Sequence, residues 1–386
     1  SNASSLSTIR EVRRISAHKF FEIQHIKSPR LRSLLFFDEF LPKEERQNAL
    51  PLTMARCLEN RGDELFNPLV CFVFHFSFSV LVTKFRGIQK YMFSNFNFLR
   101  VLDYESGGDA GCKLPNDIGK LIRLRFLRLR DLIFWSSKLP SSLGNLRCLQ
   151  TLDLRIETDI DFCKFVNVPN VIWKMQELRH LYLSKECSRK TNVKLGTLRN
   201  LQTLVNFNTK NCYVKDLINM TSLKKLKIQG PFNIEDFNEA GMGKNPPIIQ
   251  RKYLHSLSII NYEGREDPRH LSHFLSSCDI ISKLSLNVEI RRLPEYRYLS
   301  SNLAYIKLRR YELEEDPMLK LLEKLSYLRM LKLHEEAFIG KEMFCSAQGF
   351  PKLESLSLMY LGNLEEWKMD EGAMPSLQRL EKQNCS

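Results

Sequence analysis

Apolar residues recur along the chain in a single spacing, in which one apolar residue is followed three and five positions later by two more (LxxLxL). The second and third apolar positions lie two residues apart, so both side chains point to one face of a short strand. The residues between them point to the opposite face. The first apolar positions of twelve such patterns are Leu99, Leu124, Leu149, Leu178, Leu201, Leu223, Leu254, Ile281, Leu303, Leu328, Leu353 and Leu377.

Successive patterns start 22 to 31 residues apart. This period is close to that of leucine-rich repeats, which have roughly 20–29 residues. One repeat cannot bury its own apolar face, so stacked neighbours must form a continuous core. The predicted fold class is therefore an α/β solenoid, a leucine-rich-repeat horseshoe with a parallel concave β-sheet and irregular or helical convex arms.

Two segments that lead from one predicted strand to the next support this arrangement, because residues 113–130 and 138–154 share one sequence pattern. Each has Leu-Pro, then an apolar residue, then Gly and Leu before the next strand. Pro is suited to starting the convex arm, and Gly is expected to let the chain turn back.

The domain organisation follows from the spacing. Residues 1–3 (Ser-Asn-Ala) have the look of an expression scar, and residues 4–37 hold first repeats at Val12 and Leu31. Residues 38–98 are predicted to be irregular repeats or an insertion, and 99–386 regular repeats, all in one solenoid. Within 38–98, Leu69–Val82 alternates in its apolar residues, which predicts a buried strand. At fourteen residues it is shorter than the roughly 20 that a membrane-spanning helix needs.

Net charge and the placement of the cysteines indicate the kind of partner and the cellular compartment. The formal net charge is +14, which favours acidic partners of any kind. The ten cysteines are scattered singly, without a CxxC pair, which favours reduced thiols in a cytoplasmic or nuclear protein. We expect a cytoplasmic protein.

Several stretches of the chain have a recognisable sequence, namely Val12–His18, Ser28–Phe37, Phe98–Glu105, the two Leu-Pro blocks, Glu315–Leu333, Gly349–Leu358 and Leu364–Leu380. Together they resemble one family, the leucine-rich-repeat domain of plant intracellular immune receptors of the coiled-coil, nucleotide-binding class (NLR proteins). The resemblance is closest to the downy-mildew-resistance branch. It covers most of residues 1–37 and 98–386, while 38–97 match less well.

The resemblance implies a domain that contributes recognition of a pathogen effector or a guarded host protein and holds a nucleotide-binding module inactive. ATP or ADP would bind only that other module. Gly241–Lys244 lacks the first Gly of a phosphate loop, because Asn238 stands there, and it is followed by Asn245 in place of Ser or Thr. No cofactor is therefore expected in this domain. The full receptor could associate peripherally with a membrane.

The residues between the core leucines are the predicted binding surface. Ten of those on the strands from residue 99 to 381 are basic and four are acidic (Asp103, Glu105, Asp153 and Glu381), an excess of +6. Arg and aromatic residues are favoured at interface hot spots. The predicted protein-binding residues of the concave face are Phe126, Arg128, Arg130, Arg155, Tyr182, Lys225, Lys227, Tyr305, Lys307, Arg309, Met330, Lys332, His334 and Met359, and Phe207 is expected to be exposed beside them.

Other functions are less well supported. The histidines lack metal-like spacing and no catalytic base stands near Asp103 or Asp153 in sequence, so no enzyme activity or metal is expected. No stacking platform or groove-entering helix favours nucleic acid, and no transmembrane segment is expected. The alternatives are an extracellular receptor ectodomain, which would have many glycosylation sites and cysteine caps, and an adaptor or scaffold domain with a docking helix.

Overall fold

A computed structural model describes the chain in two compact units, residues 1–198 (unit 1) and 199–386 (unit 2). The described residues are 13–17, 30–37, 89–105, 114–130, 138–155, 166–185, 187–188, 190–231, 253–265, 268–276, 278–290, 298–313 and 317–385.

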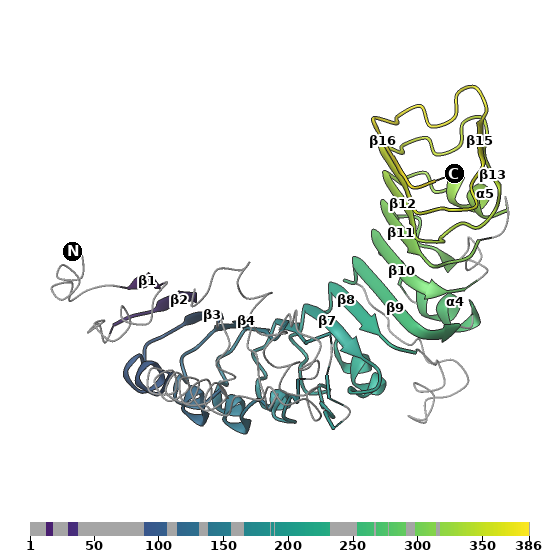
Figure 1. The fold of residues 1–386 in the computed structure, drawn as a ribbon. Coiled ribbons are helices and arrows are strands. Elements are labelled where there is room, and N and C mark those ends of the chain that lie inside the picture. Colours follow the sequence, from purple (N-terminus) through teal and green to yellow (C-terminus); the bar gives the residue numbers. More distant parts are fainter. Residues whose placement is uncertain are drawn as a thin grey trace, which may run out of the picture. The chain divides into compact units, whose positions relative to one another are not determined.

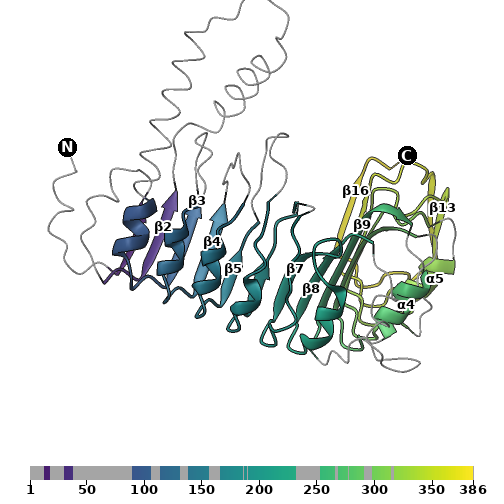
Figure 2. The ribbon, with the colours of Figure 1, turned by 90° about the horizontal axis from the view of Figure 1, so that it is seen from below.

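In the described residues of unit 1, six parallel strands pair in chain order, with helical segments on the opposite side (Figure 1, Figure 2). Each strand is short because the LxxLxL pattern supplies only three to five extended residues. The strands are β1 (Arg14–Ala17), β2 (Ser33–Phe37), β3 (Val101–Glu105), β4 (Phe126–Arg130), β5 (Thr151–Asp153) and β6 (His180–Tyr182). The 3-10 helices are η2 (Asn116–Lys120), η3 (Ser141–Asn145) and η4 (Ile172–Lys174).

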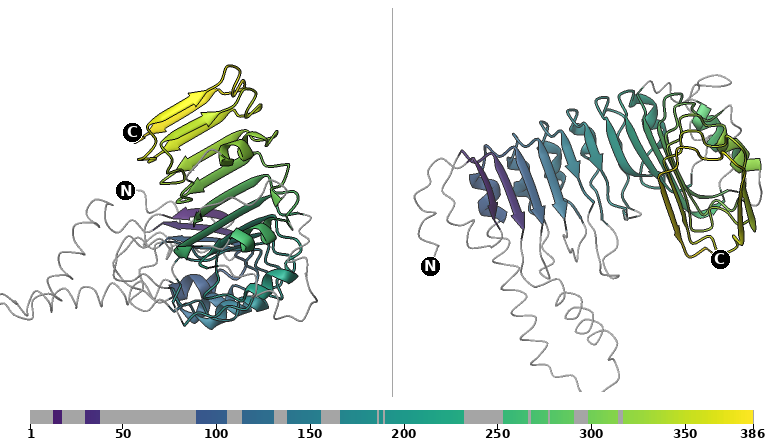
Figure 3. Two further views of the ribbon diagram at one scale, coloured as in Figure 1. Left: turned by 90° about the vertical axis from the view of Figure 1, so that its right-hand side faces the viewer. Right: turned by 90° about the horizontal axis from the view of Figure 1, so that it is seen from above.

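Unit 2 repeats this plan: the part of it that the structure describes has eight parallel strands in its main sheet and a small parallel sheet of β13 and β15 (Figure 3). The main strands are β7 (Thr203–Asn208), β8 (Lys225–Gln229), β9 (Ser256–Arg265), β10 (Lys283–Glu289), β11 (Tyr305–Arg309), β12 (Met330–His334), β14 (Ser355–Met359) and β16 (Arg379–Gln383). The remaining elements are β13 (Glu342–Cys345), β15 (Glu366–Met369), η5 (Val214–Asn219), α4 (Pro268–Ser276) and α5 (Pro317–Glu323).

The predicted core is confirmed, because the strand leucines stack in register. In unit 1, Leu102, Leu127, Leu152 and Leu181 pair in sequence across β3 to β6, and each is 0% exposed. In unit 2, Leu331 of β12 pairs with Ile306 and Leu356 on either side. Burying one such side chain contributes about 1.5–3 kcal/mol. The parallel sheet with helical arms confirms the predicted leucine-rich-repeat solenoid.

The Leu-Pro arms also form as predicted, but the glycines have another purpose. Pro115 and Pro140 precede η2 and η3 in extended conformation, which starts each arm. A Cβ on Gly119 would lie 2.6 Å from the backbone oxygen of Ser142, and a Cβ on Gly144 would lie 3.0 Å from the Cβ of Val171. These glycines therefore let neighbouring arms approach closely, and neither has a positive φ.

Three positions depart from the sequence prediction. Phe207, expected to be exposed, is 0% exposed. The pairing of β7 with β8 shifts between Leu204 and Phe207, so Phe207 pairs with Ile228 and its side chain enters the core. Asp103 and Asp153, expected to be exposed, are 6% and 3% exposed.

The boundaries 4–37, 38–98 and 99–386 stay predictions. Residues 1–12 and 38–88, which include the expression scar and the alternating Phe-rich segment, lie outside the described residues. Across the part of the chain that is described, no helix combines the length and apolar character needed to cross a bilayer.

Candidate protein-binding surfaces

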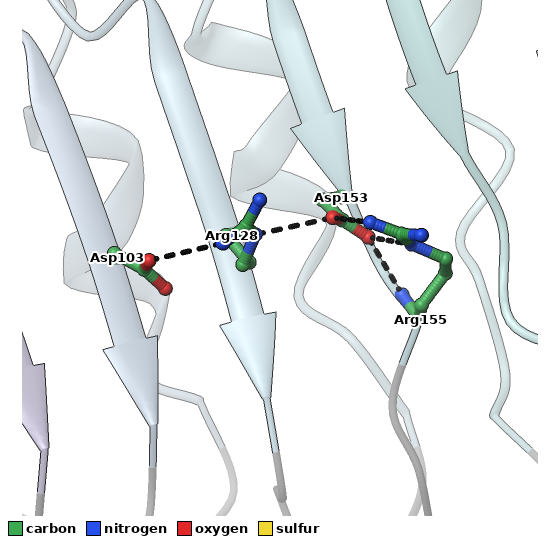
Figure 4. Close-up of polar contacts among 4 residues, drawn as sticks. All are labelled: Asp103, Arg128, Asp153 and Arg155. Atoms are coloured by element: carbon green, nitrogen blue, oxygen red, sulfur yellow. Dashed lines mark hydrogen bonds and ion pairs between the residues drawn. The ribbon is translucent and has the colours of Figure 1, made fainter.

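The sheet face of unit 1 carries an alternating row of acidic and basic side chains (Figure 4). Arg128 of β4 pairs in register with Asp103 of β3 and with Asp153 of β5. Its Nη1 lies 3.3 Å from Asp103 Oδ2, and its Nε lies 3.2 Å from Asp153 Oδ2. Arg155 donates to the same aspartate, with Nη2 2.6 Å from Asp153 Oδ2 and Nε 2.9 Å from Oδ1. The row therefore compensates its own charge.

Electrostatics in this row favour the ionised aspartate. Burial by itself raises the pKa of Asp153, but the hydrogen bonds from the side chain and backbone of Arg155 outweigh it, aided by the charges of Arg155 and Arg128. The pKa of Asp153 is lowered as a result. An ionised, nearly buried carboxylate that accepts several charged hydrogen bonds is a structural element of the sheet face.

Aromatic rings complete this part of the predicted site. The guanidinium of Arg128 lies 5.4 Å from the ring centre of Phe126, and that of Arg155 lies 4.5 Å from the ring centre of Tyr182. The predicted residues Phe126, Arg128, Arg155 and Tyr182 are thus brought together on three neighbouring repeats. Arg130 ends β4 and pairs in register with Glu105, and its side chain lies outside the described residues.

The sheet face of unit 2 aligns the other predicted residues. On β11 and β12, Tyr305 pairs with Met330, Lys307 with Lys332, and Arg309 with His334. Met359 of β14 follows His334 in the same row. On β8, Lys225 is exposed and Lys227 is half-buried, and both face serines of β9. The predicted residues on β11, β12 and β14 therefore form one continuous patch.

Charge in this patch is only partly compensated. Arg309 is paired with Glu335, with Nε 3.0 Å from Oε2 and a second contact from Nη2 to Oε1. For Lys307 and Lys332, no ion pair is present among the described residues. Burial lowers the pKa of Lys307, the charges of Arg309 and Lys332 lower it further, and Glu335 opposes them. We call Lys307, Lys332, Arg309, His334 and Glu335 the cationic patch.

His334 is the least exposed member of the cationic patch, at 9%. Its Nε2 lies 2.9 Å from the hydroxyl oxygen of Ser357, and that hydroxyl lies 3.3 Å from Glu381 Oε2. Burial lowers the pKa of His334 to about 4, together with the charges of Lys307, Lys332 and Arg309, against the opposing charge of Glu335. The imidazole is therefore neutral at pH 7.

A third charged surface was missed by sequence reasoning. Just before the strands of unit 1, the backbone of successive repeats is linked by hydrogen bonds: Arg32 N to Arg13 O, Arg100 N to Arg32 O, and Arg125 N to Arg100 O, at 2.9, 2.7 and 2.8 Å. The ladder continues through Gln150 to Arg179. The five exposed side chains form what we call the arginine edge: Arg13, Arg32, Arg100, Arg125 and Arg179.

The side chains of the arginine edge have no ion pair among the described residues. Neighbouring parallel strands are about 4.8 Å apart, so adjacent members stand close together with like charge. A signal was present in the sequence, because each of these arginines directly follows the first apolar residue of a repeat, as in Leu99-Arg100 and Leu124-Arg125. These arginines lie just before the strands, outside the strand positions from which the binding surface was predicted.

Metal chemistry has no candidate centre in the described residues, where no group of three or more His, Cys, Asp or Glu side chains is placed to hold an ion. The cysteines within the described ranges form no disulfide bond with one another, namely Cys148, Cys187, Cys212, Cys278, Cys345 and Cys385.

Comparison with known proteins now defines the class. The family model described as "Leucine-rich repeat region" matches residues 77–385. The chain therefore belongs to the leucine-rich-repeat family. Among solved structures, an internalin from Listeria monocytogenes aligns over 75% of both chains, with 17% identity and a TM-score of 0.46.

More similar sequences come from plant disease-resistance proteins. The chain is 38% identical over 290 residues to probable disease resistance RPP8-like protein 2 of Arabidopsis thaliana. This alignment covers 74% of the chain and 30% of that protein. The chain is also 38% identical over 294 residues to probable disease resistance protein RF9 of the same plant, covering 76% and 27%. These relatives confirm the resemblance to the leucine-rich-repeat region of plant resistance proteins. The chain spans less than a third of their length.

Proposed function

We propose that this chain is the protein-binding domain of a cytoplasmic plant disease-resistance receptor. It contributes recognition of an effector or a guarded host protein and restrains a nucleotide-binding module encoded elsewhere in the receptor. The observation that carries the proposal is the alignment, by the sheet register, of Lys307 with Lys332 and of the arginine edge, because these cations have no ion pair among the described residues. The relatives named as disease-resistance proteins support the biological setting.

The cationic patch is the proposed recognition surface. Lys307 and Lys332 stand side by side at half-buried positions, with Tyr305 and Met330 next to them in the same strands. A cation in a partly desolvated site gains more from a carboxylate than one in open water. Tyr305 and Met330 offer apolar contact area beside that charge. An acidic, partly apolar protein surface fits this combination.

The arginine edge is the proposed contact with the rest of the receptor. A row of five exposed arginines, of which Arg13, Arg32, Arg100 and Arg125 follow one another at strand spacing and Arg179 comes after Gln150, suits an extended or helical acidic segment, which can place several carboxylates along one line. By contrast, Arg128 and Arg155 are already engaged with Asp103 and Asp153. We therefore assign the inhibitory contact to the arginine edge in preference to the sheet face of unit 1.

Binding measurements test the two assignments separately. The chain, in its parent form and as the variants K307E/K332E and R100E/R125E, is titrated by calorimetry with candidate effectors and with the nucleotide-binding module. K307E/K332E should weaken effector binding at least tenfold and leave the module unaffected, and R100E/R125E should do the reverse. Both losses should shrink at high salt, because exposed charges are screened over about 8 Å at physiological ionic strength.

A matched control separates local effects from the change in net charge. Lys190 and Lys194 are exposed lysines of unit 1 outside both surfaces, so K190E/K194E changes the charge by the same amount. This control should bind both partners like the parent. If K190E/K194E weakens binding as much as the other variants, the interaction is non-specific and the assignment fails. In the full receptor, R100E/R125E should signal without a trigger in a cell-death assay.

A further inference from the structure

His334 lies where charge from several elements converges. Lys307 and Arg309 reach it from β11, Lys332 stands two residues before it on β12, and Glu335 follows it. From β14 and β16, Ser357 and Glu381 complete its surroundings. The imidazole is almost fully covered, and its ring is held by the hydrogen bond to Ser357.

The hydrogen-bond chain decides which ring nitrogen can take up a proton. An ionised carboxylate only accepts hydrogen bonds, so Ser357 donates its hydroxyl proton to Glu381. The Ser357 oxygen must then accept from Nε2–H of His334. The neutral imidazole is therefore protonated at Nε2, and Nδ1 is the atom with a free lone pair.

We propose that docking of an acidic side chain on Lys307 and Lys332 is coupled to uptake of one solvent proton by Nδ1 of His334, so that the cationic patch binds its partner more tightly as the pH falls. This inference rests on the proposed function of the cationic patch and adds its regulation. An N–H bond forms at Nδ1 from the lone pair of that nitrogen, and the O–H or N–H bond of the water or buffer acid that supplies the proton breaks. The imidazolium then adds a positive charge to the cationic patch.

The coupling follows from linkage. Without a partner, burial and the nearby lysines keep the imidazole neutral, because its pKa is about 4. A carboxylate over Lys307 and Lys332 offsets the charges that disfavour the imidazolium, so the pKa of His334 must rise in the complex. Between the free and the bound pKa, the dissociation constant falls at most about tenfold for each pH unit of acidification.

The test uses a ten-residue glutamate-rich peptide as the probe and calorimetry at pH 7.5, 6.5 and 5.5. All measurements are made in the R100E/R125E background, so that the arginine edge does not compete for the peptide. The glutamates of the peptide stay largely ionised over this range, since their ordinary pKa is about 4.3. Titration in two buffers of different ionisation enthalpy counts the protons taken up.

The affected variant is His334→Gln, and the control is His255→Gln, which changes an exposed histidine of unit 2. The parent and His255→Gln should bind threefold to tenfold more tightly at pH 5.5 than at pH 7.5, with net proton uptake. His334→Gln should bind with almost constant affinity and take up fewer protons. Imidazole resonances in NMR spectra should show the pKa of His334 rising when the peptide is added.

Two failures are distinguishable. If the peptide binds and K307E/K332E abolishes binding, but pH dependence is missing or persists in His334→Gln, the proton coupling is wrong and the proposed recognition surface stands. If peptide binding is unaffected by K307E/K332E, the cationic patch is not the binding surface, and both proposals are overturned.

Discussion

Arg128 in unit 1 and Lys307 in unit 2 occupy the same position of the repeat, between two core residues of a strand. Arg128 lies between two aspartates on the neighbouring strands, and a second basic side chain, Arg155, shares one of them. Lys307 lies beside another lysine and an arginine, and only the arginine has an acidic partner. One sheet face neutralises its cations, and the other leaves two of them available.

The difference teaches that charge on a repeat surface is decided by neighbours one repeat away. A partly buried carboxylate shared by two guanidinium groups stabilises the local fold, because neither charge is left unpaired out of water. Two neighbouring lysines repel each other and gain from any anion that arrives. Equivalent positions in the same sheet can therefore serve stability in one unit and binding in the other.

The largest predicted loss of stability comes from the buried core leucines, which both units share. Leu127 and Leu331 are 0% and 1% exposed at equivalent core positions. Replacing either with Ala should lower the free energy of unfolding by about 2–5 kcal/mol, because a cavity is left in a packed core. Urea unfolding followed by circular dichroism measures this. The two costs should be similar, and a variant as stable as the parent would mean that the repeat register is misassigned.

Acidification should separate the two faces. The pKa of His334 is about 4 when folded, below the ordinary 6.5, so between these values the unfolded chain binds more protons. Stability should therefore fall by up to about 3 kcal/mol as the pH drops from 6.5 to 4. The lowered pKa of Asp153 means that its contribution is present above its unfolded pKa and is lost only at pH below about 4.

His334→Gln isolates the component from unit 2. Thermal melts of this variant between pH 6.5 and 4 should show a shallower loss of stability than those of the parent. An unchanged slope would mean that other groups govern acid unfolding.

Alanine substitutions at Asp153 and Lys307 compare the stability contributions of the two sheet faces directly. Asp153→Ala should cost about 1–3 kcal/mol, because Arg128 and Arg155 lose the carboxylate that they share. Lys307→Ala should change stability by less than about 0.5 kcal/mol, since no ion pair is lost. Chemical denaturation of both variants gives the comparison. Equal costs would contradict the distinction between a compensated and an uncompensated face.

A small gain in stability is predicted for a substitution in the turns that follow the strands of unit 2. All described non-glycine residues with positive φ lie in this unit, among them Glu336, which is exposed and has a φ of 58°. Glu336→Gly should raise the free energy of unfolding by about 0.5–1 kcal/mol, because glycine tolerates this conformation without the Cβ penalty. Glu336→Ala keeps the Cβ and should show no gain, which makes it the matched control.

Much of the fold was predictable because it depends on local spacing. The first apolar residues from Leu99 to Leu353 are buried as expected, and Pro115 and Pro140 start the arms. Phe207 was mispredicted because a shift in strand pairing moved it by one position, which reverses the face. Part of the candidate site was also predictable, since the residues on β11 and β12 do gather in one patch.

The alternation of apolar and polar residues by itself determined the repeat, the core and the face on which a strand residue lies wherever the pairing stays in register, because a strand alternates with a period of two. Tertiary structure alone decided which charges meet. Arg128 is 25 residues from Asp103 and 25 residues from Asp153 in sequence. The three residues nevertheless lie on adjacent strands, where Arg128 bridges the two carboxylates. Stacking likewise set Lys307 beside Lys332 and covered His334. Ion pairing and desolvation depend on distances of a few ångströms between repeats, and the order of residues along one strand does not contain them.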